Sequence, residues 1–148
     1  MKKSDHLYIL SNIIIPLFIG ALLYYIMSPD VLFVKAIDTI IGRDIHEALF
    51  TETTGVIRFL RFYGLDILWG YAFVFSLYYI LGNNTASLKN IFIIALMFSI
   101  SMEMLQLTHF ANGTFDLLDI IFEFLAELLA VFIIKKIRLR RHEHEKKI

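Results

Sequence analysis

The chain has 148 residues, enough for one small unit of a few helices, and 58% of them are hydrophobic. Basic and acidic residues balance at 14 each, so charge gives no support to a nucleic-acid partner. Cysteine is absent, which excludes disulfides, thiolate metal sites and a cysteine nucleophile. The hydrophobic excess predicts an all-α membrane protein whose first partner is the lipid bilayer.

The first predicted element is a transmembrane helix over residues 7–27. At about 1.5 Å per residue, this stretch crosses a hydrocarbon core of ~30 Å. Lys2 and Lys3 at its start also suit a signal peptide. Pro16 interrupts the apolar stretch, however, and Ser28-Pro29-Asp30 is a poor cleavage site, so we favour a retained span.

The connection between the first and second spans, residues 30–63, is long and mixed in character. Residues 31–41 are apolar but carry Lys35 and Asp38, which predicts a helix lying along the membrane interface. Residues 51–55 predict a loop, and residues 56–62 after it form an apolar run that contains Arg58 and Arg61.

Three further hydrophobic stretches predict three more transmembrane helices. A polar turn separates the second from the third, and a short turn at Asn112-Gly113 separates the third from the fourth. The four predicted spans and the basic tail are residues 7–27, 65–81, 90–108, 117–134 and 135–148.

The distribution of positive charge predicts that both termini are cytoplasmic. With four spans the termini share one side of the membrane, and that side holds ten of the 14 Lys and Arg residues. Cytoplasmic segments carry an excess of Lys and Arg. The turn at Asn112-Gly113 then lies on the outer side.

Acidic side chains gather on one face of the fourth predicted helix. At about 100° per residue, Asp116, Asp119, Glu123 and Glu127 fall within an arc of about 80°. A central Asp costs about 2.5–3.5 kcal/mol to insert, so this face is expected to turn toward polar partners. Facing carboxyl groups at this depth cannot all ionise, and some are expected to be protonated or neutralised by a cation.

The third predicted helix has a matching polar face. Ser99, Glu103 and Gln106 fall within about 60° of one another, and the short turn predicts an antiparallel hairpin with the fourth helix. Asp66 and Trp69, at the start of the second span, are expected to close the site from another side, although Trp69 also suits an interfacial belt. The candidate counter-charges are Arg58, Arg61 and His109.

Purely structural roles remain open for several of these residues. Glu103 and Gln106 suit an inter-helix hydrogen-bonding pair that only holds the helices together. Asp116 precedes an apolar run and suits an N-cap, and Asp119 lies in the first turn, where the helix dipole favours an acid. Glu123 lies too deep for either explanation.

The polar segment resembles the signature of VanZ-like membrane proteins. The residues that carry the resemblance are Glu103-x-x-Gln106, a short turn, and Gly113-Thr114-Phe115-Asp116-x-x-Asp119. In that family a Glu and a Gln end one transmembrane helix, and a Phe-Asp-x-x-Asp segment begins the last one. Gly113 stands where the family often has Arg, and Glu123 where Asn is usual, so the chain resembles a divergent member.

The resemblance implies a multi-pass protein of the bacterial cell membrane, associated with the envelope and with resistance to glycopeptides such as teicoplanin. An acidic pocket near the outer leaflet would then bind a cation, a polar lipid or a cell-wall precursor. The expected binding residues are Glu103, Gln106, Asp116, Asp119, Glu123, Asp66 and Trp69. No cofactor is predicted, and a metal in the pocket is left open.

Three other functions fit the same residues. Carboxylate pairs serve as general acid and base in a membrane enzyme acting on a lipid-linked substrate. Stacked acids on one helix resemble a relay in proton- or ion-coupled transport. A small assembly subunit would use the same side chains to pair with another membrane protein or with a second copy.

Overall fold

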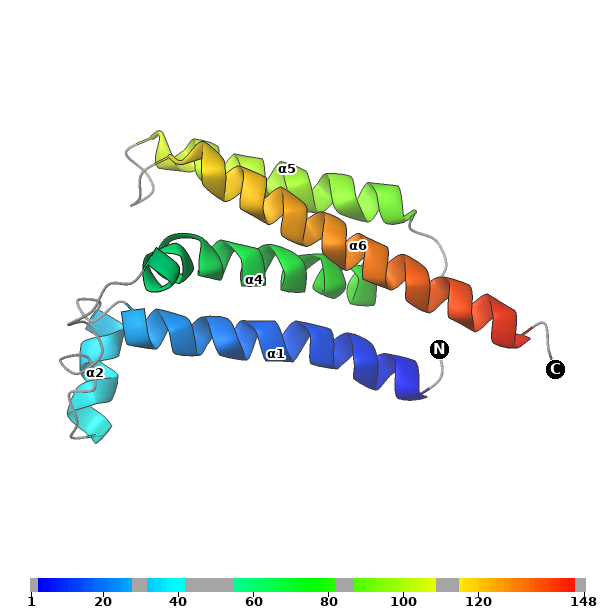
Figure 1. Cartoon of the computed structure of the whole chain (residues 1–148), viewed down its shortest axis with the longest axis horizontal. Helices are drawn as coiled ribbons and strands as arrows, with labels where there is room; N and C mark the ends of the chain where they lie inside the picture. Colours follow the sequence, from blue (N-terminus) through cyan, green and yellow to red (C-terminus); the bar gives the residue numbers. More distant parts are fainter. Residues whose placement is uncertain (1–2, 28–31, 42–54, 82–86, 109–114, 146–148) are drawn as a thin grey trace.

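A computed structural model describes residues 3–27, 32–41, 55–81, 87–108 and 115–145 (Figure 1). These residues are almost entirely α-helical, which confirms the all-α prediction for the described part of the chain. The helices are α1 (Lys3–Met27), α2 (Leu32–Ile41), α4 (Gly55–Leu81), α5 (Leu88–Gln106) and α6 (Leu117–Glu145).

The four long helices run alternately in opposite directions along the long axis of the molecule (Figure 1). Helix α4 is central, because it contacts α1, α5 and α6, and α5 and α6 also pack against each other as the predicted hairpin. The start of α1 and the end of α6 therefore lie at the same end of the bundle. At the opposite end α2 lies across α1, where the Tyr25 hydroxyl donates a hydrogen bond to Asp38.

Three of the helices are long and apolar enough to cross a membrane: Asp5–Met27, Phe62–Leu81 and Leu88–Gln106. They coincide with the first three predicted spans. Helix α6 is not among these apolar helices, because three acidic residues fall within its first three turns: Asp119, Glu123 and Glu127.

Two helices extend beyond their predicted ends. Helix α4 begins at Gly55, so the predicted loop residue at this position and the apolar run after it belong to the helix. No proline interrupts the run, and an internal glycine costs only about 1 kcal/mol. Helix α6 continues past Ile134 to Glu145, because its Lys, Arg, Leu and Glu residues are good helix formers. The predicted turns at 82–85 and Asn112-Gly113 lie outside the described residues.

An apolar core fills the end of the bundle where α1 begins and α6 ends, and we call this region the apolar half. Its fully buried residues come from all four long helices, and the Tyr78 hydroxyl among them is buried without a hydrogen-bond partner in the described part of the chain. They are Ile9, Val74, Phe75, Tyr78, Ile91, Ala95, Ala130 and Ile134.

The buried stripe of α5 changes character along its length. Four residues at a four-residue spacing are buried: Ile91, Ala95, Ser99 and Glu103. This spacing keeps one face of the helix toward its neighbours. The first two residues belong to the apolar core, whereas the last two bring polar groups to the opposite end of the bundle.

Candidate functional site

A polar cavity of ≈ 120 Å³ lies between α4, α5 and α6. Each of the three helices contributes an acidic residue to its wall, and aromatic and amide side chains complete it. We call this region the acidic half. The lining residues are Asp66, Trp69, Gly70, Phe73, Phe98, Ser99, Met102, Glu103, Gln106 and Glu123.

The three acids reach the cavity from different directions. Asp66 comes from α4, Glu103 from α5 and Glu123 from α6. Glu103 is buried, and the other two are partly buried. Carboxylates confined to one small cavity repel one another, and the repulsion grows as water is excluded. A bound cation would relieve that repulsion, so this arrangement suits a positively charged group.

Glu103 is held in place at both of its oxygens. The Gln106 amide donates to Oε1 at 2.8 Å, and the backbone N–H of Asp116 donates to Oε2 at 3.3 Å. The Glu103–Gln106 bond lies within α5, so the two do not form the inter-helix pair considered from the sequence. The link between helices runs instead from Glu103 to the backbone at the start of α6, and it fixes the direction of this carboxylate.

Three aromatic rings form an apolar wall beside the acids. The ring centroids of Trp69 and Phe73 lie 4.8 Å apart, those of Phe73 and Phe98 4.9 Å apart, and those of Trp69 and Phe98 6.0 Å apart. Aromatic faces attract cations, and carboxylates next to them form the cages that bind organic ammonium groups. The cavity therefore combines the two features that such ligands use.

Gly70 brings α4 and α6 close together beside the cavity. A Cβ atom placed on Gly70 would lie 3.5 Å from both the Cα atom and the carbonyl oxygen of Glu123. An alanine would fit at ordinary contact distance, whereas a larger side chain would push the helices apart. The absence of a side chain here sets the position of Glu123 against α4.

A second buried acid lies deeper, at the boundary with the apolar half. Glu127 is fully buried, and its Oε1 accepts a hydrogen bond of 2.9 Å from the Ser99 hydroxyl. Its Oε2 is buried with no hydrogen-bond partner among the described residues. Ser99 also lines the cavity, so one hydroxyl connects the floor of the cavity to the deepest acid.

Asp116 and Asp119 lie beside the cavity and do not line it. The Asp116 side chain accepts a hydrogen bond of 2.9 Å from the backbone N–H of Leu118, so the N-cap interpretation is confirmed. Asp119 lies in the first turn of α6, as the dipole interpretation requires. The cavity thus contains five of the seven predicted binding residues: Asp66, Trp69, Glu103, Gln106 and Glu123.

The predicted counter-charges are only partly described. Arg58 is exposed in the first turn of α4 and does not line the cavity. The side chain of Arg61 and all of His109 lie outside the described residues. Within the described residues, no group of three His, Asp or Glu side chains is placed so that it could hold a metal ion.

Sequence reasoning missed Phe98 and Met102 as cavity residues and missed the Ser99–Glu127 hydrogen bond. Phe98 and Met102 flank the polar face that it identified, one position away from Ser99 and Glu103, and helical spacing alone marks such flanking positions as lipid-facing. The Ser99–Glu127 bond joins residues 28 positions apart, which no local pattern encodes. Comparison of the chain with protein-family models, with curated proteins and with solved structures finds no match.

Proposed function

We propose that α6 is a fourth transmembrane helix and that the chain is a four-span membrane protein. Its acids make α6 more polar than the other spans, but Glu123 faces the cavity and Glu127 is fully buried by neighbouring helices. The large exposed residues along the same stretch are apolar. They are Leu117, Leu118, Ile121, Phe124, Leu125, Leu128, Leu129 and Phe132. The lipid-facing surface of α6 is therefore as hydrophobic as a span requires.

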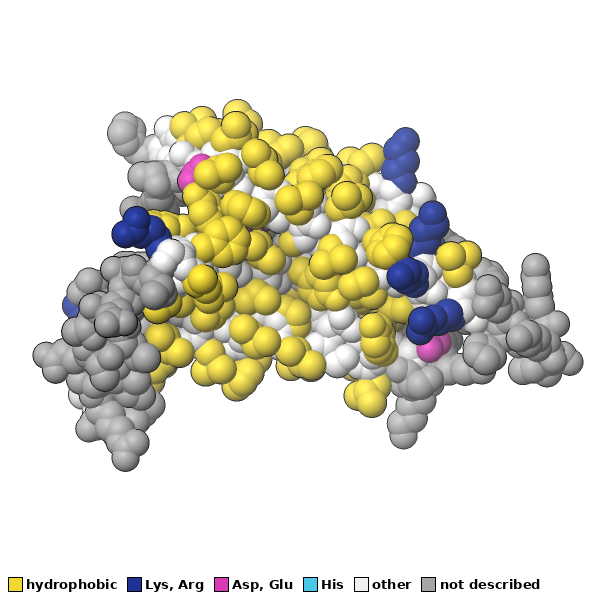
Figure 2. All heavy atoms as spheres, in the orientation of Figure 1, with side chains coloured by type: hydrophobic (Ala, Val, Ile, Leu, Met, Phe, Trp, Pro, Cys, Tyr) yellow, Lys and Arg dark blue, Asp and Glu magenta, His cyan; other side chains and the backbone are white. Residues whose placement is uncertain are grey.

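The charge at the two ends supports a cytoplasmic location for both termini. Figure 2 shows a broad apolar band, with most of the visible Lys and Arg at the end where α6 leaves the bundle and fewer at the opposite end. Lys89 at the start of α5 lies at this end with the basic residues of α6. Cytoplasmic segments are rich in Lys and Arg. The acidic half then lies near the outer leaflet.

Single-cysteine labelling tests this topology, because the chain has no cysteine of its own. Leu107→Cys places a thiol after α5, and Arg140→Cys places one near the end of α6. In intact cells a membrane-impermeant maleimide should label the first, and should label the second only after permeabilisation. Labelling of both from the same side would show that α6 does not cross the membrane.

The cavity supports binding of an organic ammonium group as the molecular function. The observation that carries this proposal is the convergence of Asp66, Glu103 and Glu123 from three helices on one cavity whose wall includes three aromatic rings. Carboxylates neutralise the charge of an ammonium, and the ring faces stabilise its alkyl groups and its charge.

The resemblance to VanZ-like proteins suggests the biological setting of this ligand. The residues of that resemblance lie where α5 ends and α6 begins, at the turn end of the hairpin: Glu103, Gln106, Asp116 and Asp119. We therefore propose a VanZ-like protein of the bacterial envelope. Its ligand would be the amino group of a lipid headgroup or of a cell-wall precursor, reached from the outer leaflet.

Fluorescence offers a direct test, because Trp69 is the only tryptophan of the chain and lines the cavity. Butylammonium should change the emission of the purified protein in a saturable way, and the neutral analogue butanol should not. Glu103→Gln and Glu123→Gln should each weaken binding about tenfold or more, since a hydrogen bond to a charged group contributes about 1.5–3 kcal/mol.

Asp116→Asn is the matched control. It removes one negative charge near the cavity but keeps a good N-cap residue, so binding should change by much less than in the two Gln variants. Equal responses to butylammonium and butanol, or equal losses in Asp116→Asn and Glu123→Gln, would contradict the proposed ammonium site.

A further inference from the structure

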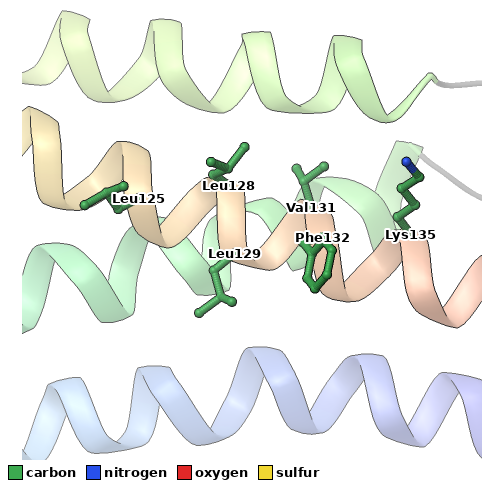
Figure 3. A pocket seen from close by; sticks show the side chains of 6 residues that line it. All are labelled: Leu125, Leu128, Leu129, Val131, Phe132 and Lys135. Carbon is green, nitrogen blue, oxygen red and sulfur yellow. The ribbon is translucent and has the colours of Figure 1, made fainter.

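The outward face of α6 carries a shallow, open apolar groove that is separate from the acidic cavity. It has a volume of ≈ 490 Å³, and every residue that lines it belongs to α6 (Figure 3). The lining residues are Leu125, Leu128, Leu129, Val131, Phe132 and Lys135. None of them lines the cavity between α4, α5 and α6.

Two lysines stand at one end of this groove. Lys135 is itself part of the lining, and Figure 3 shows it beyond the apolar side chains along the helix. The Nζ atom of Lys136 lies 4.6 Å from the centroid of the Phe132 ring, and this ring forms part of the groove wall. Two ammonium groups therefore flank the end where the apolar stretch of α6 stops.

The position of the groove along α6 matches one leaflet of a bilayer. From Leu125 to Lys135 the helix advances about 15 Å at 1.5 Å per residue, which is about half of a ~30 Å hydrocarbon core. The apolar part of the groove then faces acyl chains, and the lysines lie at the level of the headgroups. Lysines at this level direct their ammonium groups toward the interface.

We propose that this groove binds one anionic phospholipid of the inner leaflet. An acyl chain would lie along Leu125–Phe132, and the headgroup phosphate would lie between Lys135 and Lys136. Charge complementarity selects the occupant, because a neutral lipid fills the apolar part equally well but gains much less from the two lysines. This site rests on the proposed crossing of the membrane by α6.

Retention of defined lipids by the purified full chain tests the proposal. The probes are phosphatidylglycerol and phosphatidylcholine with identical acyl chains, detected by native mass spectrometry after detergent exchange. Phosphatidylglycerol should be retained preferentially, and Lys135→Gln and Lys136→Gln should each lower its retention about fivefold, as expected for one basic residue near an anionic surface. Equal retention of the two lipids would overturn the site.

Lys89→Gln is the matched control, because it makes the same change of charge at the same end of the bundle but outside the groove. It should alter retention less than twofold. A loss as large as that in Lys135→Gln would show that retention depends on the general surface charge, and it would overturn a defined site.

Leu129→Phe, which narrows the groove with both lysines intact, should also lower retention while Trp69 emission stays unchanged. Unaltered retention in this variant would contradict the proposed position of the acyl chain in the groove.

A second copy of the chain is the competing occupant of the groove. Leu129→Cys would be the only cysteine in the chain, so a disulfide-linked dimer formed in the bilayer would show that another copy covers the groove and would overturn the lipid site. The labelling of Leu107→Cys and Arg140→Cys separates the two proposals. If that labelling shows that α6 crosses the membrane while Lys135→Gln leaves retention unchanged, the lipid site fails alone.

Discussion

Helices α4, α5 and α6 run through both halves of the bundle, and α1 adds Ile9 to the apolar half, yet the two halves use different side chains. On α5 the buried stripe is Ile91 and Ala95 in the apolar half and Ser99 and Glu103 in the acidic half. Between transmembrane helices, close packing of small and apolar residues is enough for association. Packing alone therefore does not account for three acids that converge on one cavity, and their convergence is what we interpret as a binding site.

The boundary between the halves is the hydrogen bond from Ser99 to Glu127. On the apolar side of this bond the buried residues of α6 are Ala130 and Ile134, and on the acidic side Glu123 faces the cavity. The Oε2 atom of Glu127, which has no hydrogen-bond partner among the described residues, lies at this boundary. The variants below test whether side chains on the apolar side of this bond determine stability and side chains on the acidic side determine ligand binding.

The largest effect is expected from an acid placed in the apolar half. Ala95 is fully buried in the apolar core, so Ala95→Asp would bury a carboxyl group without a designed partner and lower the free energy of unfolding by about 3 kcal/mol. Unfolding by SDS in mixed micelles measures this change. Ala95→Ser is the control, since its hydroxyl can bond to the backbone of its own helix. Equal stability of the two variants would show that the apolar half tolerates acids as the acidic half does.

The second effect concerns the boundary itself. Ser99→Ala removes the donor to Glu127 Oε1 and should lower the free energy of unfolding by about 1–3 kcal/mol, because both oxygens would then be buried without a partner. Adding Glu127→Leu should restore most of that stability, since no polar group remains unpaired. The same SDS titration measures the free energy of unfolding of both variants. If the double variant is less stable than Ser99→Ala, the cost does not come from the unpaired carboxyl group of Glu127.

A smaller effect is expected at the start of α6. Asp116→Ala removes the N-cap acceptor for the backbone of Leu118 and should cost about 1 kcal/mol of stability. Asp116→Asn should keep that stability. Asp116 does not line the cavity, so butylammonium binding should survive in both variants, and loss of binding in both would place the carboxyl of Asp116 in the site.

The smallest effect is expected from the aromatic wall. Trp69→Leu removes the ring face that best attracts a cation and should weaken butylammonium binding about threefold, as expected for a partly exposed cation–π contact. Because this variant lacks the fluorescent reporter, calorimetry provides the readout. Unchanged affinity would show that the carboxylates act without the aromatic wall.

The sequence predicts the helices and the polar faces well, for physical reasons that apply to particular residues. Long apolar runs identify three spans, and helical geometry brings Glu103, Gln106 and Glu123 onto facing sides. Periodicity does not reveal how far each helix rotates toward its neighbours. For that reason periodicity predicts Asp119 in the cavity, although it does not line it, and gives no sign of Phe98, which does.

Helix ends were also harder to predict than helix faces. The sequence predicts Gly55 as a loop residue, but Gly55 begins α4. The basic segment after Ile134 continues α6 to Glu145. Neither helical extension contains a proline, the residue that most strongly stops a helix. The hydrogen bond from Ser99 to Glu127 depends on how α5 and α6 pack along their whole length. Only the three-dimensional arrangement of the hairpin shows it.

The most direct test of the division between the halves is a paired measurement on Glu123→Gln. The carboxyl of Glu123 shares a small cavity with those of Asp66 and Glu103, so removing its charge relieves repulsion while keeping the shape of the side chain. Butylammonium binding by Trp69 fluorescence should weaken about tenfold or more. The free energy of unfolding without ligand should stay equal or rise. A loss of stability with binding intact would contradict the account, because Glu123 would then hold the bundle together and bind nothing.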